Sequence, residues 1–171
     1  MKIPFRPFSF IKPKRPYRYI ILHDLSCQFN DLPELAIDTK KFESGKVRLL
    51  DYVFNNHTDV NYHYMVEKVG DDYETIVGRP LNALCKFSDI VSPFDASIHI
   101  CLVGFYKQQV PDSRYYKQLA YRAVAPLMSV FKINRSRVLL HKDISEKSNC
   151  PGNLFKRDVF MNVLQTMSVQ Y

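Results

Sequence analysis

The chain contains the run Tyr17-Arg18-Tyr19-Ile20-Ile21-Leu22-His23, and the predicted architecture is built around it. Aromatic and β-branched residues favour an extended backbone, and a short apolar run of this kind is typical of a buried strand. His23 follows the run directly, so the strand would carry an imidazole at its carboxyl end. A strand end holds a side chain in a fixed position at the edge of a sheet, which suits a metal ligand or a catalytic group.

Four further strands are indicated downstream. Residues 61–69 and 73–77 flank Gly70-Asp71-Asp72 and predict a hairpin, because these turn residues suit a short connection. Residues 97–103 place Ile98, Ile100 and Leu102 on one face, as a strand does. Residues 137–140 are short and apolar and would deliver a second imidazole, His141, at a strand end.

Helices are predicted between these strands, over about residues 46–55, 112–131 and 154–167. The long one starts at Asp112, which is a good N-cap, and Pro126 should kink or divide it. Strands interspersed with helices predict the α/β class: a single domain with a mixed β-sheet flanked by helices.

The composition is that of an ordinary globular domain, with a formal net charge of +7 over 171 residues. Residues 1–16 hold four of the ten prolines and no acidic residue, which predicts a basic, extended arm ahead of a domain at 17–171. A basic surface favours polyanions such as an anionic cell envelope or nucleic acid, and it is equally typical of a solvated face. No recognised nucleic-acid motif follows the arm, so no specific nucleic-acid partner is predicted.

Neither a membrane span nor a secretion signal is predicted. Every apolar run is shorter than the roughly 20 residues that a bilayer requires. The charges of residues 1–19 are scattered among prolines, without the continuous apolar core of a signal peptide. We therefore expect synthesis in the cytoplasm.

His23, His141 and Cys150 are the residues whose types and positions indicate a metal. Two imidazoles and a thiolate form a good zinc triad, and an open fourth position for water marks a catalytic zinc site. Each residue alone has a simpler interpretation, since a histidine at a strand end is often structural and a single cysteine is often a small buried apolar residue. The spacing favours the metal without deciding between these interpretations.

At this point the sequence resembles the zinc-dependent N-acetylmuramoyl-L-alanine amidases, the family of the small phage endolysin amidases and the peptidoglycan recognition proteins. Five segments carry the resemblance, in family order over most of the chain. They are Tyr19-Ile20-Ile21-Leu22-His23, Asp59-Val60-Asn61-Tyr62-His63-Tyr64, Gly78-Arg79, Ser97-Ile98-His99-Ile100-Cys101-Leu102-Val103-Gly104, and His141-Lys142-Asp143-Ile144 with Cys150-Pro151-Gly152.

The resemblance implies one zinc ion per chain, held by His23, His141 and Cys150, and a mixed-sheet fold of the amidase and peptidoglycan-recognition-protein type. Zinc activates water and polarises a carbonyl, so the implied reaction is hydrolysis of the amide between N-acetylmuramic acid and L-alanine in peptidoglycan. Tyr62 matches a family tyrosine beside the metal, where its phenol would stabilise the oxyanion or relay a proton. His63, the next residue, is expected on the opposite face in a structural role.

The chain departs from the family pattern in three places. A family lysine or threonine two residues before the cysteine is replaced by Ser148, and we favour Lys147 as the catalytic cation because a cation is the stronger partner for an oxyanion. Cys101 stands where some relatives carry a glutamate, and a thiol cannot serve as a carboxylate base. His99 replaces a family glycine and would either face the zinc cleft or pack in the core. Arg79, His99 and Ser148 are the candidates for substrate contact.

The leading functional hypothesis is therefore a zinc-dependent peptidoglycan amidase, a bacteriolytic hydrolase of the phage endolysin type. Such a protein would act on the cell wall after release from the cytoplasm with the help of a holin. The alternative is a non-catalytic or regulatory peptidoglycan-binding protein on the same fold. In the family, loss of the cysteine ligand accompanies loss of catalysis, and the presence of Cys150 favours the enzyme. A nucleic-acid-binding or virion protein acting through its basic arm is a third possibility.

Overall fold

A five-stranded mixed sheet forms the centre of the fold in the computed structural model, which describes residues 16–25, 42, 44–51, 60–85 and 87–167. The strand order is β3-β2-β4-β1-β5. The bounds are β1 (Tyr19–Asp24), β2 (Tyr64–Val69), β3 (Asp72–Val77), β4 (Ser97–Leu102) and β5 (Val138–Leu140). Strands β2, β4, β1 and β5 run parallel, and β3 pairs antiparallel with β2 at one edge.

The parallel pairing brings separate parts of the chain to one end of the sheet. Leu22 in β1 lies beside Ile100 in β4 and beside Leu140 in β5. The next residues along β1 and after β5 are His23 and His141, so the two histidines leave neighbouring strands at the same edge. The carboxyl ends of parallel strands are the usual place for a site in an open α/β sheet.

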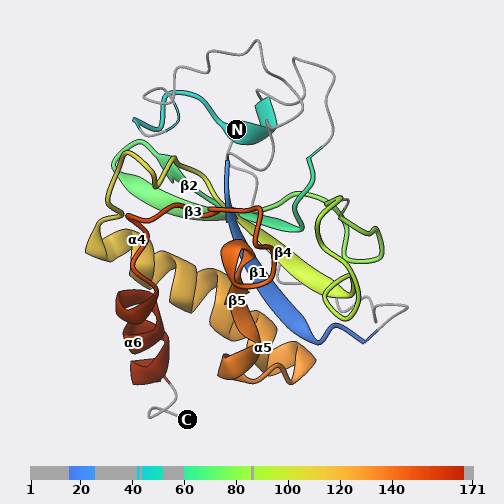
Figure 1. The fold of residues 1–171 in the computed structure, drawn as a ribbon. Coiled ribbons are helices and arrows are strands. Elements are labelled where there is room, and N and C mark those ends of the chain that lie inside the picture. The colour runs from blue at the N-terminus through green and yellow to red at the C-terminus, as the bar shows by residue number, and fades with distance from the viewer. Residues whose placement is uncertain (1–15, 26–41, 43, 52–59, 86, 168–171) are drawn as a thin grey trace.

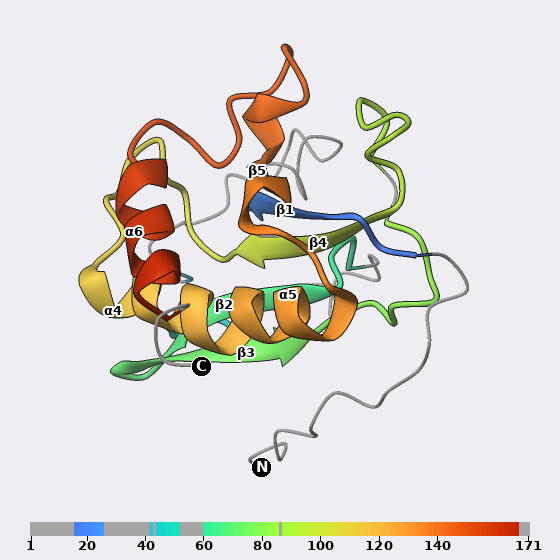
Figure 2. The ribbon, with the colours of Figure 1, turned by 90° about the horizontal axis from the view of Figure 1, so that it is seen from below.

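Helices cover one face of this sheet (Figure 1). A continuous helical rod is made of α4 (Ser113–Gln118), the π-helical η1 (Leu119–Val124) and α5 (Ala125–Phe131), and α6 (Arg157–Met167) packs beside it. Figure 2, which views the molecule from below, shows the same rod lying across the sheet. Two single 3₁₀ turns, η2 (Arg135–Arg137) and η3 (His141–Asp143), flank β5.

The long helix carries both features that its sequence predicts. The side chain of Asp112 accepts a hydrogen bond from the backbone N–H of Tyr115 at 2.8 Å, as an N-cap does. Pro126 stands in the first turn of α5, directly after the π-helical segment. A proline has no N–H to continue the α-helical bonding, and the wider π turn before it takes up the mismatch.

The two faces of the sheet bury different side chains. The helix-covered face holds a large apolar core, to which β1 contributes Ile20 and Leu22 and β4 contributes Ile98, Ile100 and Leu102. The opposite face holds a smaller apolar cluster with Tyr62, Met65 and Cys101, packed under the segment that contains Phe42 and Leu49. Because side chains alternate along a strand, His23 and His99 belong to this second face.

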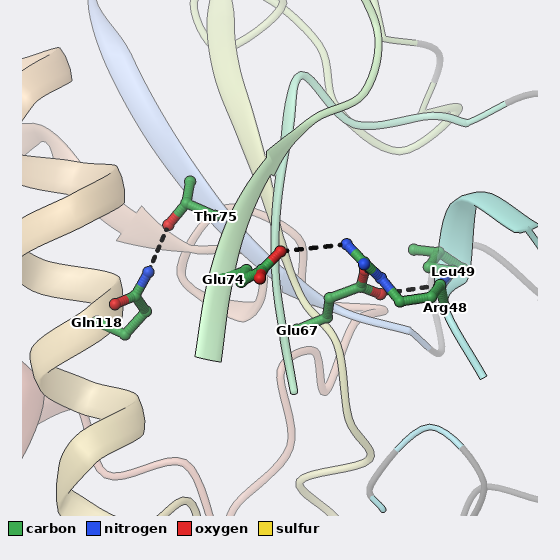
Figure 3. A network of polar contacts seen from close by, with 6 residues as sticks. All are labelled: Arg48, Leu49, Glu67, Glu74, Thr75 and Gln118. Carbon is green, nitrogen blue, oxygen red and sulfur yellow. Dashed lines mark hydrogen bonds and ion pairs between the residues drawn. The ribbon is translucent and has the colours of Figure 1, made fainter. Parts of the chain in front are cut away.

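Polar contacts on both faces of the sheet hold the hairpin of β2 and β3 (Figure 3). Glu67 of β2 is 1% exposed, and its carboxylate accepts the backbone N–H of Leu49 at 2.9 Å and pairs with Nε of Arg48 at 2.5 Å. Burial raises the pKa of Glu67, and the bonds from Leu49 and Arg48 oppose that rise. On the other face, Gln118 of α4 donates to Thr75 of β3 at 3.2 Å. The hairpin is therefore anchored from both sides.

The predicted class, one mixed sheet flanked by helices, is confirmed. Strand β2 starts at Tyr64, three residues later than predicted, so strand alternation does not apply to Tyr62 and His63. The Tyr62 ring lies against His23, and the His63 ring lies against both His99 and Tyr17, a residue of the helix-covered core. The predicted arm at residues 1–16 lies outside the described residues except for Pro16, and so do residues 52–55 of the first predicted helix.

Candidate metal centre and active site

His23, His141 and Cys150 come together at the carboxyl end of the parallel strands. One ligand atom from each residue lies within 4.8 Å of the others. The side chains are 0%, 3% and 2% exposed, in that order, so the three potential ligands face one another away from solvent. Three residues separated by 118 and 9 positions in sequence therefore form one compact donor set.

The loop after η3 brings Cys150 back beside His141. The backbone N–H of Lys142 donates to the carbonyl of Cys150 at 2.9 Å, which closes this loop. Gly152 then passes against another backbone, with a φ of +89° and space for no side chain, because a Cβ there would lie 2.5 Å from the carbonyl carbon of Tyr106. Glycine is the residue that tolerates both conditions.

The backbone of Asp24 forms hydrogen bonds with both the thiol of Cys150 and the hydroxyl of Tyr62. Its N–H donates to Sγ of Cys150 at 3.0 Å, and its carbonyl accepts from the hydroxyl of Tyr62 at 3.2 Å. A bond from an N–H group stabilises a thiolate, the form of cysteine that binds a metal. The ring of Tyr62 lies 5.5 Å from that of His23, so the phenol is held next to the donor set.

His23 is in the chemical state that a metal requires. Burial, and after it the nearby His99 and His141, hold the pKa of His23 well below its usual value, so its ring is neutral at pH 7. Its Nε2 lies 2.9 Å from Nδ1 of His99. Its Nδ1 is buried and makes no hydrogen bond to any described residue. A buried polar atom without a partner is costly and is expected to meet an ion or a ligand.

His141 has a polar neighbour at each ring nitrogen. The hydroxyl of Ser148 lies 3.1 Å from Nδ1, and Oδ2 of Asp89 lies 2.9 Å from Nε2. The hydroxyl of Ser145 donates to the same Asp89 oxygen at 2.6 Å. Desolvation raises the pKa of Asp89, but the bond from Ser145 and the proximity of His141 outweigh it, so the pKa is lowered overall. A polar group at the second nitrogen of a ligand histidine fixes the orientation of the ring.

These observations fit zinc. Two imidazoles and one cysteine thiol are the donor set of a catalytic zinc site with three protein ligands. The buried Nδ1 of His23, which makes no hydrogen bond to any described residue, would be satisfied by such an ion.

A family model described as N-acetylmuramoyl-L-alanine amidase matches residues 13–153. The chain belongs to this amidase family. No curated protein matches the amidase in sequence.

Solved structures of similar fold come from bacterial, phage and human proteins. The amidase LysC from Clostridium intestinale URNW has a TM-score of 0.54 at 17% identity, over 90% of this chain and 86% of that one. The Ph2119 endolysin from a Thermus scotoductus MAT2119 bacteriophage has a TM-score of 0.53 at 22% identity, over 88% and 86%. Human PGRP-IBETAC, in complex with glycosamyl muramyl pentapeptide, has a TM-score of 0.54 at 17% identity, over 86% and 84%. At these identities the likeness establishes the fold.

The other predicted residues of the amidase lie in different surroundings. Ser148 contacts a predicted ligand, whereas Lys147 is exposed and no bond within the described part of the chain joins it to the cluster. Arg79 donates to the carbonyls of Val60 and Leu84 at 3.0 and 2.8 Å, which ties the hairpin to the following loop. Substrate contact by Arg79 and Ser148 stays a prediction.

Two residues of the site were not found from the sequence. Phe87 stacks on the His23 ring at 4.4 Å between centroids with planes 9° apart, and Asp89 reaches His141. Both lie in the irregular stretch between Pro80 and Ala96, which has no periodicity and no recognisable motif. Only the folded loop shows that they contact the cluster. In the described part of the amidase, no helix combines the length and apolar character that crossing a bilayer requires.

Proposed function

We propose that this amidase binds one zinc ion through His23, His141 and Cys150 and uses it to hydrolyse the bond between N-acetylmuramic acid and L-alanine in peptidoglycan. The observation that carries the proposal is the buried donor set with its ligand atoms within 4.8 Å of one another. Membership of the amidase family supports the reaction class. The stem-peptide amide is a linear amide, a substrate that zinc hydrolases of this kind cleave with an activated water.

The chain's own residues hold and tune the metal. Cys150 and the two histidines supply the ligands, and the Asp24 N–H bonded to Sγ favours the thiolate. When bound there, zinc supplies the Lewis acidity that polarises a carbonyl and activates water at neutral pH. If one nitrogen of His141 held the metal, Ser148 or Asp89 at the other nitrogen would orient the ring.

We assign Tyr62 and Lys147 to stabilise the negative charge that develops on the substrate during hydrolysis. The Tyr62 hydroxyl lies beside the donor set and can donate to an oxyanion or pass a proton to the leaving amine. Lys147 is exposed, three residues before Cys150, and its ammonium group is available to a bound substrate. The thiol of Cys101 offers no carboxylate, whereas Asp89 places a carboxylate oxygen 2.9 Å from Nε2 of His141.

The test is digestion of purified peptidoglycan by the zinc-loaded amidase with analysis of both kinds of product end. Amidase chemistry releases new N-terminal L-alanine and creates no new reducing sugar ends. A His141→Ala variant that keeps the fold should release no N-terminal L-alanine and create no reducing ends. New reducing ends would instead indicate a glycosidase, and binding of peptidoglycan without any new end would favour the non-catalytic, regulatory alternative.

We also propose a setting for this activity, the lysis of a bacterial wall by a phage-type endolysin that leaves the cytoplasm with the help of a holin. The endolysins of similar fold and the net charge of +7 support it. In this proposal residues 17–171 are the catalytic domain and the basic residues 1–16 favour an anionic envelope. Removal of residues 1–16 should weaken adsorption to whole walls and leave cleavage of a small soluble muropeptide intact. Loss of both would contradict this division of roles.

A further inference from the structure

His99 occupies an unusual position in the sheet. It lies in β4 opposite Ile21 of β1, is 2% exposed, and shares the site face with His23. Its Nδ1 is 2.9 Å from Nε2 of His23. The family resemblance puts a glycine at this position, and a glycine has no side chain that could make this contact.

The contact restricts how His23 can carry its proton. A neutral imidazole has one N–H, so in a bond between two neutral rings one nitrogen donates and the other accepts. If His99 donated, the proton of His23 would lie on its Nδ1, where it would be a buried donor with no acceptor among the described residues. If His23 donates from Nε2, its Nδ1 keeps a lone pair that can bind a metal.

We propose that His99 is a positioning residue that holds His23 as the tautomer protonated at Nε2, so that the Nδ1 lone pair is available to the metal. The inference rests on the proposed function, because it requires His23 to be a zinc ligand. The contact through which His99 would act is the one between its Nδ1 and Nε2 of His23.

His63 keeps His99 in place for this role. The backbone N–H of His99 donates to Nδ1 of His63 at 3.0 Å, and Nε2 of His63 lies 3.0 Å from the carbonyl of Ala83. Because Nδ1 of His63 accepts, its proton is on Nε2 and is donated to that carbonyl. The acceptor, His99, is thus fixed by the sheet on one side and by His63 on the other.

The direct test is nitrogen NMR of the zinc-loaded amidase labelled with ¹⁵N in histidine. We expect His23 to show a protonated Nε2 and a metal-bound Nδ1. A His99→Leu variant removes the acceptor, and its dissociation constant for zinc should rise by about 10- to 100-fold, the usual effect of losing a partner of a ligand histidine. In His99→Asn the amide oxygen takes the place of Nδ1, and most of the affinity should return.

Ser97→Ala is the matched control, since Ser97 is buried on the same face of β4 and bonds only to the carbonyl of Phe94 among the contacts described for its hydroxyl. Its zinc affinity should equal that of the unmodified amidase. A protonated Nδ1 on zinc-bound His23 would overturn the proposal without any variant, and so would one bound zinc with the same affinity in His99→Leu. Absence of stoichiometric zinc in the unmodified amidase would overturn the proposed function as well.

Discussion

The two faces of the central sheet are formed by the same strands, but one buries apolar side chains and the other buries polar groups of the candidate site. Toward the helices, β1 presents Ile20 and Leu22 to an apolar core that needs only shape and volume. Toward the other side it presents His23, one of several buried polar groups that each require a partner. Because neighbouring residues of one strand lie on opposite faces, we expect substitutions to change stability and the proposed zinc chemistry separately.

The largest effect is expected from Cys150→Ser on the polar face. A hydroxyl is a poor substitute for a thiolate ligand, so zinc should be lost and amide cleavage should fall by about a thousandfold or more, which corresponds to several kcal/mol of lost transition-state stabilisation. Metal analysis and the rate of L-alanine release measure the two losses. Retention of both zinc and activity would show that Cys150 is not a ligand.

On the apolar face, Leu22→Ala should reduce the free energy of unfolding by about 2–5 kcal/mol, because it removes a fully buried side chain and leaves a cavity. Urea unfolding measures this change. At a temperature where the variant is folded, its zinc content should still be one ion per chain. Loss of zinc from the folded variant would mean that the two faces are not separable.

The polar face should also make stability depend on pH. Burial lowers the pKa of His63 from its usual value of 6.5 to about 4. Between these values the unfolded chain binds a proton that the folded chain does not, so the unfolding free energy should fall as the pH decreases from 6.5 to 4. The shift corresponds to about 3 kcal/mol at full protonation.

Urea unfolding of the metal-free amidase across this pH range measures the effect, and His63→Gln should give a flatter dependence. Burial likewise keeps the pKa of His23 and of His99 well below normal, which acts in the same direction. An equal slope in the unmodified amidase and in His63→Gln would contradict the contribution of His63.

Tyr62 and Tyr64 allow the two faces to be compared by removal of a single hydroxyl group from each. Tyr62 lies against the donor set, whereas Tyr64 belongs to the apolar core under the helices. Tyr62→Phe should lower amide cleavage by about 100-fold and keep the zinc, since it removes one donor to the reacting groups. Tyr64→Phe is the matched control and should leave cleavage unchanged. Equal activity of both variants would exclude a catalytic role for Tyr62.

The smallest effects concern the loop before Cys150. Lys147→Ala should slow cleavage by about tenfold without changing zinc affinity, because an exposed cation can act only on the substrate. Ser148→Ala should weaken zinc binding by about tenfold instead, since the Ser148 hydroxyl contacts His141. Cleavage rates at saturating zinc, together with zinc dissociation constants, separate the two outcomes. Unchanged cleavage in Lys147→Ala would remove it from the active site.

The sequence predicted the parts of the amidase that depend on local pattern. The apolar runs predicted the strands, Asp112 predicted the start of the long helix, and Pro126 predicted the irregularity inside it. Two histidines at strand ends and Cys150 predicted a donor set that the fold brings together. The start of β2 was misplaced because an apolar pattern continues before Tyr64 although the backbone there is not a strand.

The contacts of the loops could not be predicted in the same way. Phe87 and Asp89 reach the cluster only because the irregular stretch after β3 folds back over it, and no periodicity encodes that path. The pairing of His99 with His23 depends on the register between β4 and β1, which places His99 opposite Ile21. The alternation of side chains along the strand predicted which face His99 shares with Cys101, but it did not predict that His99 contacts His23.

We propose that one zinc ion, held by His23, His141 and Cys150, is required for cleavage of the peptidoglycan amide. The most direct test is a titration of the metal-free amidase with zinc in which bound zinc and L-alanine release are measured in the same samples. We predict that activity rises in proportion to bound zinc and stops rising at one ion per chain. Full activity in the metal-free protein, or activity that does not follow the bound zinc, would contradict the claim.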